Sequence, residues 1–314
     1  MPKADARPVV RAHRLLKYSV GVLAAALQCV GLASCQTTVP QTWSTPPGAS
    51  TQVVNGYPLT YSSRGSGPTV VFVGGVLTDY RVWQQSLSSW EPQFRVVAVS
   101  PRHFFPEKWN GKAADFTVRQ HAKDLEAFIE SLGGPVFLVG WSYGAHISYE
   151  AARARPDLVK KLVLVEAPLD SLLLVADAGA NAIRIERASK TEKFFAAGDI
   201  DGGLMYSLDA INGAGVWAAT PESRRQGLRD NAWTVVGIGR EEAARVTCAD
   251  FGALLMPVLL VQGELTTPRF HQLVAEEFKC LPQAKVVTIP KAGHTSPLTN
   301  PSAFHAEAAT FLQP

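Results

Sequence analysis

The sequence is poor in sulfur and in charge. Its 314 residues include only four cysteines and three methionines, and 18% are charged. No set of cysteines and histidines has the spacing of metal ligands, so we expect neither a metal site nor a cofactor. The formal net charge is +3, but residues 1–34 carry five basic side chains against one acidic one. The remainder is close to neutral and has no basic stripe, which argues against a nucleic-acid partner.

Long apolar runs are also lacking. The run Val20–Leu32 is shorter than the roughly 20 residues that a transmembrane helix needs. A basic stretch precedes this run and small residues follow it, which is the layout of a secretory signal peptide. With 46% hydrophobic residues, the chain beyond this leader can still bury a sizeable core.

The run Leu32–Cys35 (Leu-Ala-Ser-Cys) resembles the bacterial lipobox, in which the cysteine becomes the lipidated first residue. The resemblance predicts a signal peptide over 1–34, a membrane anchor on Cys35 and a flexible tether over 35–51. Gln36 after the cysteine favours the outer membrane, with the protein facing the periplasm. The alternative is ordinary cleavage after a small residue, which would release a soluble periplasmic protein.

Cys248 and Cys280 are the cysteines that lie beyond this leader and anchor. An exported protein meets an oxidising compartment, where a disulfide between the two is plausible. Two buried thiols are the alternative, because free cysteine is commonly buried.

From about residue 52, short apolar runs alternate with segments of helical periodicity. The runs are continuous, as in parallel strands covered on both faces, and they comprise 69–73, 96–99, 136–139, 162–165, 258–261 and 286–289. Helical spacing covers 117–132, 144–155, 270–278 and 301–312, the last with Asn300 as N-cap and Pro301 at its first position. This alternation predicts an α/β fold with right-handed crossovers.

One long segment breaks the alternation. Residues 167–251 contain no convincing strand, and the stretches 181–197 and 222–238 look helical. We interpret 167–251 as a helical lid that divides the core into 52–166 and 252–314.

The sequence Gly-Trp-Ser-Tyr-Gly at 140–144 lies between a predicted strand and a predicted helix. This is the context of a nucleophile elbow, whose sharp turn exposes a serine hydroxyl and needs small flanking residues. The start of the following helix also favours negative charge that develops at the serine. We therefore predict that Ser142 is a nucleophile.

Val-Gly-Gly-Val at 73–76, followed by Asp-Tyr-Arg-Val-Trp at 79–83, resembles the loop after the first central strand of α/β hydrolases. The resemblance covers about residues 55 to 313. It implies a mostly parallel sheet flanked by helices, with the lid between the sixth and seventh strands. It also implies that the amides of Val76 and Tyr143 form an oxyanion hole. The family's histidine, which orders this loop, is replaced here by Gly74.

In this fold the catalytic histidine follows the last strand. His294 lies just beyond the run 286–289 and before the closing helix, so we predict that it is the general base for Ser142.

The acid of the triad is not where the family usually has it. The usual position corresponds to Thr266, which cannot stabilise an imidazolium electrostatically. Glu166, at the end of the run 162–165, occupies a position from which some relatives supply the acid, and a carboxylate at the tip of a buried strand needs a partner. Glu264 is the alternative acid, and the absence of an effective acid is the third possibility.

Several further residues are candidates for substrate binding. Arg102 and His103 follow the run 96–99 at the sheet edge where ligands bind in such folds. The alternative is that Arg102 pairs with a core acid and this loop packs under the lid. Trp141 beside the nucleophile, like Trp217, Asn231 and Trp233 in the lid, either lines the pocket or only packs.

These residues predict a serine hydrolase that cleaves a small acyl substrate, such as a carboxylic ester or thioester, through an acyl-enzyme. Family members that act on haloalkanes or epoxides use aspartate as the nucleophile, so Ser142 argues against both activities. Carbon–carbon hydrolysis and cofactor-free perhydrolysis would use the same triad. The alternative that is not an enzyme is a lipid-anchored binding protein with the same fold.

Overall fold

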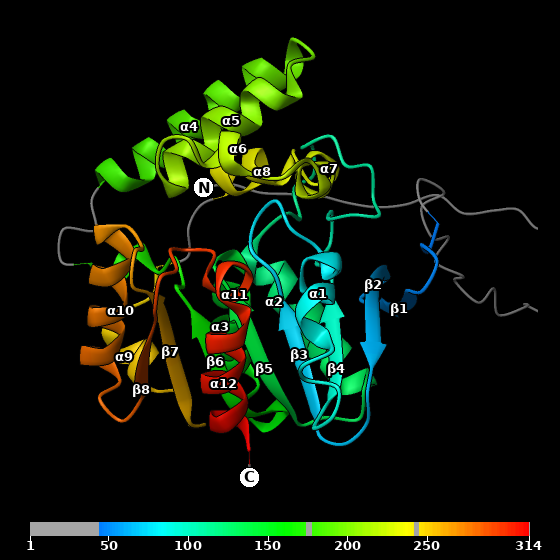
Figure 1. Cartoon of the computed structure of the whole chain (residues 1–314), viewed down its shortest axis with the longest axis vertical. Coiled ribbons are helices and arrows are strands. Elements are labelled where there is room, and N and C mark those ends of the chain that lie inside the picture. Colours follow the sequence, from blue (N-terminus) through cyan, green and yellow to red (C-terminus); the bar gives the residue numbers. More distant parts are fainter. Residues whose placement is uncertain (1–43, 174–177, 242–244, 314) are drawn as a thin grey trace, which may run out of the picture. The chain divides into compact units, whose positions relative to one another are not determined.

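The computed structural model describes residues 44–173, 178–241 and 245–313 (Figure 1). The predicted signal peptide, Cys35 and most of the predicted tether lie outside the described residues. The chain divides into two compact units, 1–37 and 38–314, and all described residues belong to the second.

One sheet of eight strands forms the centre of the described residues, in the order β1-β2-β4-β3-β5-β6-β7-β8. The strands are β1 (Ser50–Val54), β2 (Tyr57–Arg64), β3 (Thr69–Val73), β4 (Arg95–Val99), β5 (Val136–Trp141), β6 (Val159–Val165), β7 (Val258–Gly263) and β8 (Lys285–Ile289). β1 and β2 pair antiparallel, β2 pairs antiparallel with β4, and the strands from β4 to β8 are parallel. The first strand starts inside the segment that we predicted as tether.

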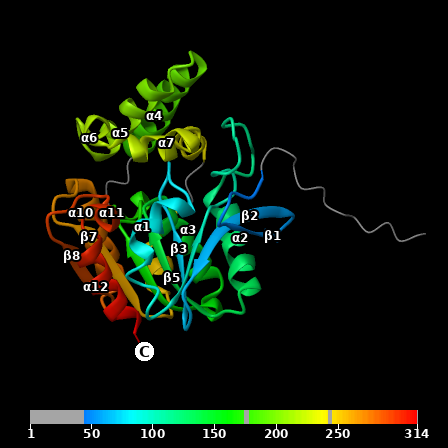
Figure 2. The same cartoon turned by 45° about the vertical axis from the view of Figure 1, so that its right-hand side comes forward.

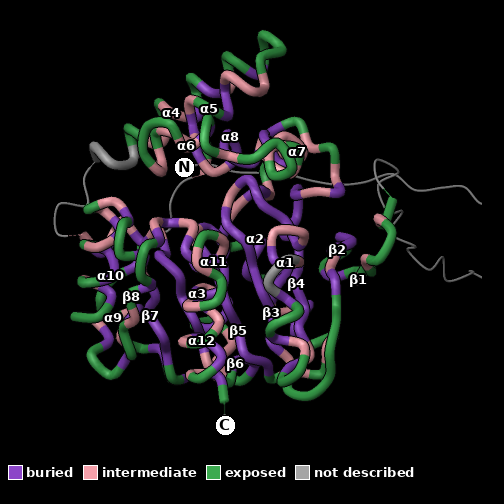
Figure 3. Tube along the Cα trace, viewed as in Figure 1, coloured by how far each residue is buried: buried purple, intermediate pink, exposed green. Residues whose placement is uncertain are grey.

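Helices cover both faces of this sheet (Figures 1 and 2). Successive residues of a strand point to opposite faces, so each central strand supplies two apolar clusters. In β3, Val71 and Val73 pack with α2 (Val118–Ser131) and α3 (Tyr143–Ala154). Val70 and Phe72 pack on the other face with α12 (Pro301–Leu312). Figure 3 shows the central strands as a continuous buried layer, which explains their uninterrupted apolar sequences.

The remaining core elements are short or lie at the sheet edges. They are η1 (Tyr80–Trp83), α1 (Gln84–Leu87), η2 (Pro156–Leu158), α10 (Pro268–Cys280) and α11 (Ser296–Thr299). Asn300 caps α12 as predicted, since its side chain accepts a hydrogen bond from the Ala303 amide at 3.3 Å.

The segment between β6 and β7 contains helices and no strand in its described part, and α4–α8 lie beyond the carboxyl ends of the strands, whereas α9 lies beside α10 (Figure 1). It contains η3 (Asp170–Leu172), α4 (Ala178–Ala196), α5 (Ile200–Asn212), α6 (Val216–Ala219), α7 (Glu222–Asp230), α8 (Thr234–Arg240) and α9 (Cys248–Gly252). We keep the name lid for α4–α8. The sequence did not reveal α5, and the predicted helix over 222–238 is two helices with a break at 231–233.

Cys248 at the start of α9 and Cys280 at the end of α10 form a disulfide. It joins the end of the helical insertion to the second part of the core. Among the described residues, no helix combines the length and apolar character that a membrane span requires.

Candidate active site

Ser142 lies in the sharp turn between β5 and α3, with φ of 53° and ψ of −121°. The turn is tight because β5, α3 and the end of β3 approach closely. A Cβ at Gly144 would lie 2.4 Å from the carbonyl oxygens of Val73 and Gly74, and one at Gly140 would lie 2.5 Å from the Gly144 carbonyl. Only glycine fits at 140 and 144, which explains the flanking glycines of the motif.

His294 lies after β8, where the sequence predicted it. Its Nε2 is 2.9 Å from the Ser142 Oγ. The ring stacks on Phe270 of α10 at a centroid distance of 4.0 Å, and the His294 carbonyl accepts a 2.8 Å hydrogen bond from the Trp141 indole. The ring stack and the backbone hydrogen bond hold the imidazole in one orientation, in which Nε2 can accept the proton of the Ser142 hydroxyl.

Glu166 directly follows β6 and is the third member of the hydrogen-bonded series that runs from Ser142 through His294. Its Oε2 lies 2.6 Å from the His294 Nδ1, and the residue is 1% exposed. The backbone has a φ of 46°, a left-handed conformation that a non-glycine residue adopts at a cost. Two further donors hold the carboxylate: the Gly263 amide at 2.7 Å and the Thr266 hydroxyl at 2.8 Å. The carboxylate is therefore fixed as an acceptor, so Nδ1 carries the proton and Nε2 is free to act as a base.

The structure separates the two candidate acids. The side chain of Glu264 is exposed and accepts a hydrogen bond from the Lys291 amide at 2.7 Å. It does not contact His294, so the alternative assignment to Glu264 is wrong on geometry. Thr266 occupies the position where the family usually has the acid, and its hydroxyl donates a hydrogen bond to Glu166. The sequence at position 266 indicates only that the usual acid is missing and does not predict this role.

A second buried carboxyl, Glu277 of α10, lies close enough to Glu166 to sense its charge. Burial, and then the neighbouring Glu166 charge, raise the pKa of Glu277 well above its usual value. Glu277 is 1% exposed, and its Oε1 has no hydrogen-bond partner in the described part of the chain.

The predicted oxyanion loop approaches Ser142 closely. A Cβ at Gly75 would lie 3.1 Å from the Ser142 Cβ, so the backbone before Val76 passes directly over the nucleophile. Tyr143 begins α3, and its phenol is hydrogen-bonded to His121 Nδ1 at 2.9 Å. Burial lowers the pKa of His121 to about 3, so its neutral ring accepts that bond. The loop that contains Gly75 and Val76 and the first residue of α3, Tyr143, thus lie next to Ser142. That their amides form the oxyanion hole stays a prediction.

The prediction that Arg102 and His103 bind substrate needs correction. The Arg102 guanidinium forms two hydrogen bonds with Asp124, at 2.8 and 3.0 Å, and a third with Asp115 at 3.0 Å. The His103 ring lies between Glu107 at 3.0 Å and Asp115 at 2.8 Å. Arg102 pairs with the buried Asp124 and with the partly exposed Asp115, and His103 pairs with Glu107 and Asp115. For Arg102, pairing with a core acid is the alternative that the sequence left open.

The assignment of Trp141 is corrected in the same way. It is 4% exposed, and its ring packs edge-on against Trp83 at 6.3 Å, on the face of the sheet opposite α3. Its indole N–H holds the His294 loop, so Trp141 positions the histidine rather than lining a pocket. Asn231 in the lid is also buried and packs between lid and core.

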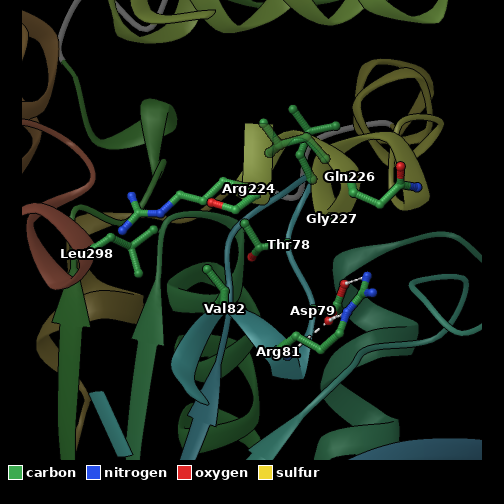
Figure 4. Close-up of a pocket in the computed structure, with 11 residues that line it drawn as sticks. Thr78, Asp79, Arg81, Val82, Arg224, Gln226, Gly227 and Leu298 are labelled. Carbon is green, nitrogen blue, oxygen red and sulfur yellow. Dashed lines mark hydrogen bonds and ion pairs between the residues drawn. The ribbon is translucent and has the colours of Figure 1, made fainter. Parts of the chain in front are cut away.

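A cavity of about 360 Å³ opens between the loop after β3, the lid helix α7 and α11. Figure 4 shows Arg224 and Gln226 on the lid side, with Thr78 and Val82 of the loop facing them. Leu298, four residues after His294, closes one side. The cavity therefore adjoins the predicted oxyanion loop.

No group of three or more His, Cys, Asp or Glu side chains in the described ranges is arranged to hold a metal ion.

Comparison with known proteins gives consistent matches. An alpha/beta hydrolase family model matches residues 70–308. A 2-(acetamidomethylene)succinate hydrolase from Mesorhizobium japonicum is 26% identical over 267 residues, covering 75% of this chain and 84% of that protein. An alpha/beta hydrolase from Sphaerobacter thermophilus superposes with a TM-score of 0.66 at 22% identity, covering 84% of this chain and 100% of that one. A thermophilic esterase from Thermogutta terrifontis, with malate bound, gives 0.63 at 20% identity, covering 86% and 96%. These matches confirm the predicted fold.

Proposed function

Because the chain belongs to the alpha/beta hydrolase family, we propose that it is a serine hydrolase that cleaves a carboxylic ester, thioester or related acyl bond through an acyl-enzyme. The observation that carries the proposal is the unbroken row from Ser142 through His294 to Glu166, with distances of 2.9 and 2.6 Å. A nucleophile, a base and an orienting acid in hydrogen-bond contact are what this chemistry requires.

In the first half-reaction, the Ser142 hydroxyl attacks the substrate carbonyl while His294 Nε2 takes its proton. Glu166 stabilises the imidazolium that forms and remains ionised. The negative charge on the former carbonyl oxygen is stabilised by the amides of Val76 and Tyr143, and by the positive end of α3. His294 then gives its proton to the leaving alcohol or thiol as the tetrahedral intermediate collapses.

In the second half-reaction, water attacks the acyl-enzyme. His294 accepts a proton from that water and returns it to the Ser142 oxygen, which releases a carboxylic acid and restores the enzyme. The cavity beside the oxyanion loop provides room for the part of the substrate that extends away from Ser142. Two of the relatives named above support a small acyl substrate: one is a 2-(acetamidomethylene)succinate hydrolase and the other is an esterase with malate bound.

We also propose that the protein works outside the cytoplasm, anchored in the outer membrane through lipid on Cys35. The support is the leader pattern of the sequence together with the Cys248–Cys280 disulfide, since disulfides persist mainly in oxidising compartments. Metabolic labelling with a radioactive fatty acid, compared between the native chain and Cys35→Ser, tests this. Label that is equal in both would refute the lipid anchor.

Hydrolysis of p-nitrophenyl esters tests the proposed activity. The panel runs from acetate to long acyl chains and includes an acid-terminated hemisuccinate ester. We expect release of p-nitrophenol that Ser142→Ala abolishes, while Ser148→Ala keeps it. Ser148 is a matched control because it lies on the same helix, is fully buried and does not contact the triad. A folded native chain that turns over no acyl substrate would favour the non-catalytic alternative.

A further inference from the structure

Leu77, the residue after Val76, is part of a core loop but packs against the lid. Leu77 is 2% exposed, and its side chain lies in the apolar cluster of the lid rather than in either core cluster. Its partners there are Phe195, Leu204, Trp217, Ala232, Val235 and Val236. The backbone of Leu77 has a φ of 67°, a conformation that persists in a non-glycine residue only where its surroundings impose it.

A main-chain hydrogen bond reinforces this contact. The Leu77 amide donates to the Thr234 Oγ1 at 3.0 Å, and the Thr234 hydroxyl donates to the Asn231 carbonyl at 2.6 Å. Thr234 is 1% exposed, so its hydroxyl uses one donor and one acceptor without help from solvent. The break between α7 and α8 places both lid residues against the loop.

The same break supplies a second connection. The Asn231 Nδ2 donates to the Asp79 carboxylate at 2.6 Å, and its Oδ1 accepts from the Phe105 amide at 2.8 Å. Asp79 is also paired with Arg81, which reaches Asp230 of the lid at 2.8 Å. Loop residues 77–81 are therefore attached to the lid at both ends.

The inner side of the loop shows why an external support is needed. The family's histidine is replaced by Gly74, and a Cβ there would lie 2.5 Å from the Thr78 Oγ1. The Thr78 hydroxyl occupies that space and donates to the Gly75 carbonyl at 2.7 Å. This bond closes the turn within the loop, whereas the Leu77 amide beyond it is held by Thr234 of the lid.

We propose that Thr234 and Leu77 are positioning residues that hold the Val76 amide in the oxyanion hole, so that the lid is a structural part of the catalytic machinery. The inference rests on the proposed function. Movement of the α7–α8 break away from the core would carry Leu77 with it and displace the donor. Substrate that binds under a seated lid would then meet a complete oxyanion hole, whereas a displaced lid would leave Tyr143 as the remaining donor.

The test compares variants on both sides of this connection. Thr234→Val keeps the shape and removes the acceptor, Thr234→Ser keeps the hydroxyl, and Leu77→Gly removes the side chain while accepting the positive φ. Thr191→Val is the matched control, because Thr191 is a fully buried lid threonine whose hydroxyl bonds to Ser207 at 2.5 Å and not to the loop.

We expect Thr234→Val and Leu77→Gly to lower kcat by about 10- to 100-fold with KM changed by less than about threefold, because losing an oxyanion donor outright costs about 10²- to 10³-fold. Thr234→Ser should retain most of the rate, and Thr191→Val should lose stability alone. If one of the two test variants does not fold, the other decides.

Equal kcat in Thr234→Val, Leu77→Gly and Thr191→Val would overturn the inference while leaving the proposed function intact. A rise in KM alone would also overturn it, because that would make the lid residues ordinary binding contacts. An inactive native chain would instead refute the proposed function, and this inference with it.

Discussion

Replacing Glu166 by glutamine should disable the enzyme through the tautomer of His294. The carboxylate accepts bonds from Gly263 N–H, the Thr266 hydroxyl and His294 Nδ1. A glutamine side chain has one oxygen and one NH₂ group. The Gly263 amide is a fixed donor, so it attracts the oxygen and leaves the NH₂ group facing His294. That NH₂ group donates to Nδ1, which moves the ring proton to Nε2 and blocks proton transfer from Ser142.

The expected loss is large because Glu166 is the hydrogen-bond partner of His294 Nδ1 in the described part of the chain. The corresponding amide substitution in another triad lowers kcat by ~10⁴, or about 5.5 kcal/mol of transition-state stabilisation. Burst and steady-state kinetics with p-nitrophenyl acetate measure this directly. KM should change little, since Glu166 lies behind the histidine and away from the substrate.

Glu264→Gln is the matched control, because Glu264 is exposed and supports only the Lys291 amide. It should keep kcat within about twofold. A loss below about tenfold in folded Glu166→Gln, or a greater loss in Glu264→Gln, would refute the assignment of the acid.

Three further predictions concern positioning, pH and the disulfide. Trp141→Phe removes the hydrogen bond to the His294 carbonyl and should lower kcat by about fivefold, since a net hydrogen bond contributes roughly 1 kcal/mol; an unchanged kcat would show that the loop is held without it. Desolvation opposes protonation of His103, but its two flanking carboxylates outweigh it and raise its pKa above 6.5. The stabilisation that protonated His103 gives the folded state is fully present below pH 6.5 and is lost as the pH rises through the raised pKa. His103→Gln should therefore lower the free energy of unfolding in urea more at pH 5.5 than at pH 9. The reverse order would contradict this prediction. Removing the Cys248–Cys280 disulfide, whose cysteines are 32 residues apart, should lower the unfolding free energy by about 3–4 kcal/mol, and a loss under about 1 kcal/mol would contradict it.

Local signals explain which parts of the site were predictable. Ser142 and His294 are each fixed by their own neighbourhood: a strand, a small-residue turn and a helix for the first, and the end of the last strand for the second. Glu166 became a candidate because position 266 carries a threonine, and the structure places its carboxylate against His294. The strands from β3 to β7 were predictable because burial on both faces makes their sequences largely apolar. β8 was predicted as a buried strand as well, but it is the edge strand and only Ile289 in it is buried.

Interactions between distant segments were not predictable. The sequence allowed Arg102 to pair with a core acid but did not identify the acid, because its partners Asp115 and Asp124 lie 13 and 22 residues further along the chain. The helix α5 was missed because Gly202 and Gly203 follow an aspartate, a sequence that is typical of a loop. In the structure a different aspartate, Asp199, caps the helix by accepting a hydrogen bond from the Gly202 amide.

The contact between the lid and the oxyanion loop was not predictable from the sequence either. Thr234 lies 157 residues beyond Leu77 and has no sequence signal that relates it to the oxyanion loop. A single predicted helix over 222–238 hides the break at 231–233 that brings this threonine to the loop. Such a break depends on what the lid packs against, and the sequence of the lid alone does not specify that.

The most direct measurement of the central claim is covalent labelling of the native chain with a fluorophosphonate, followed by mass spectrometry of the modified peptide. The reagent reacts with a serine only where a base activates its hydroxyl and an oxyanion hole accepts its phosphoryl oxygen. We expect one adduct, on Ser142, that is absent in Ser142→Ala and strongly slowed in Glu166→Gln. Folded native protein that remains unlabelled, or an adduct on another serine, would contradict the assignment of Ser142 as the nucleophile.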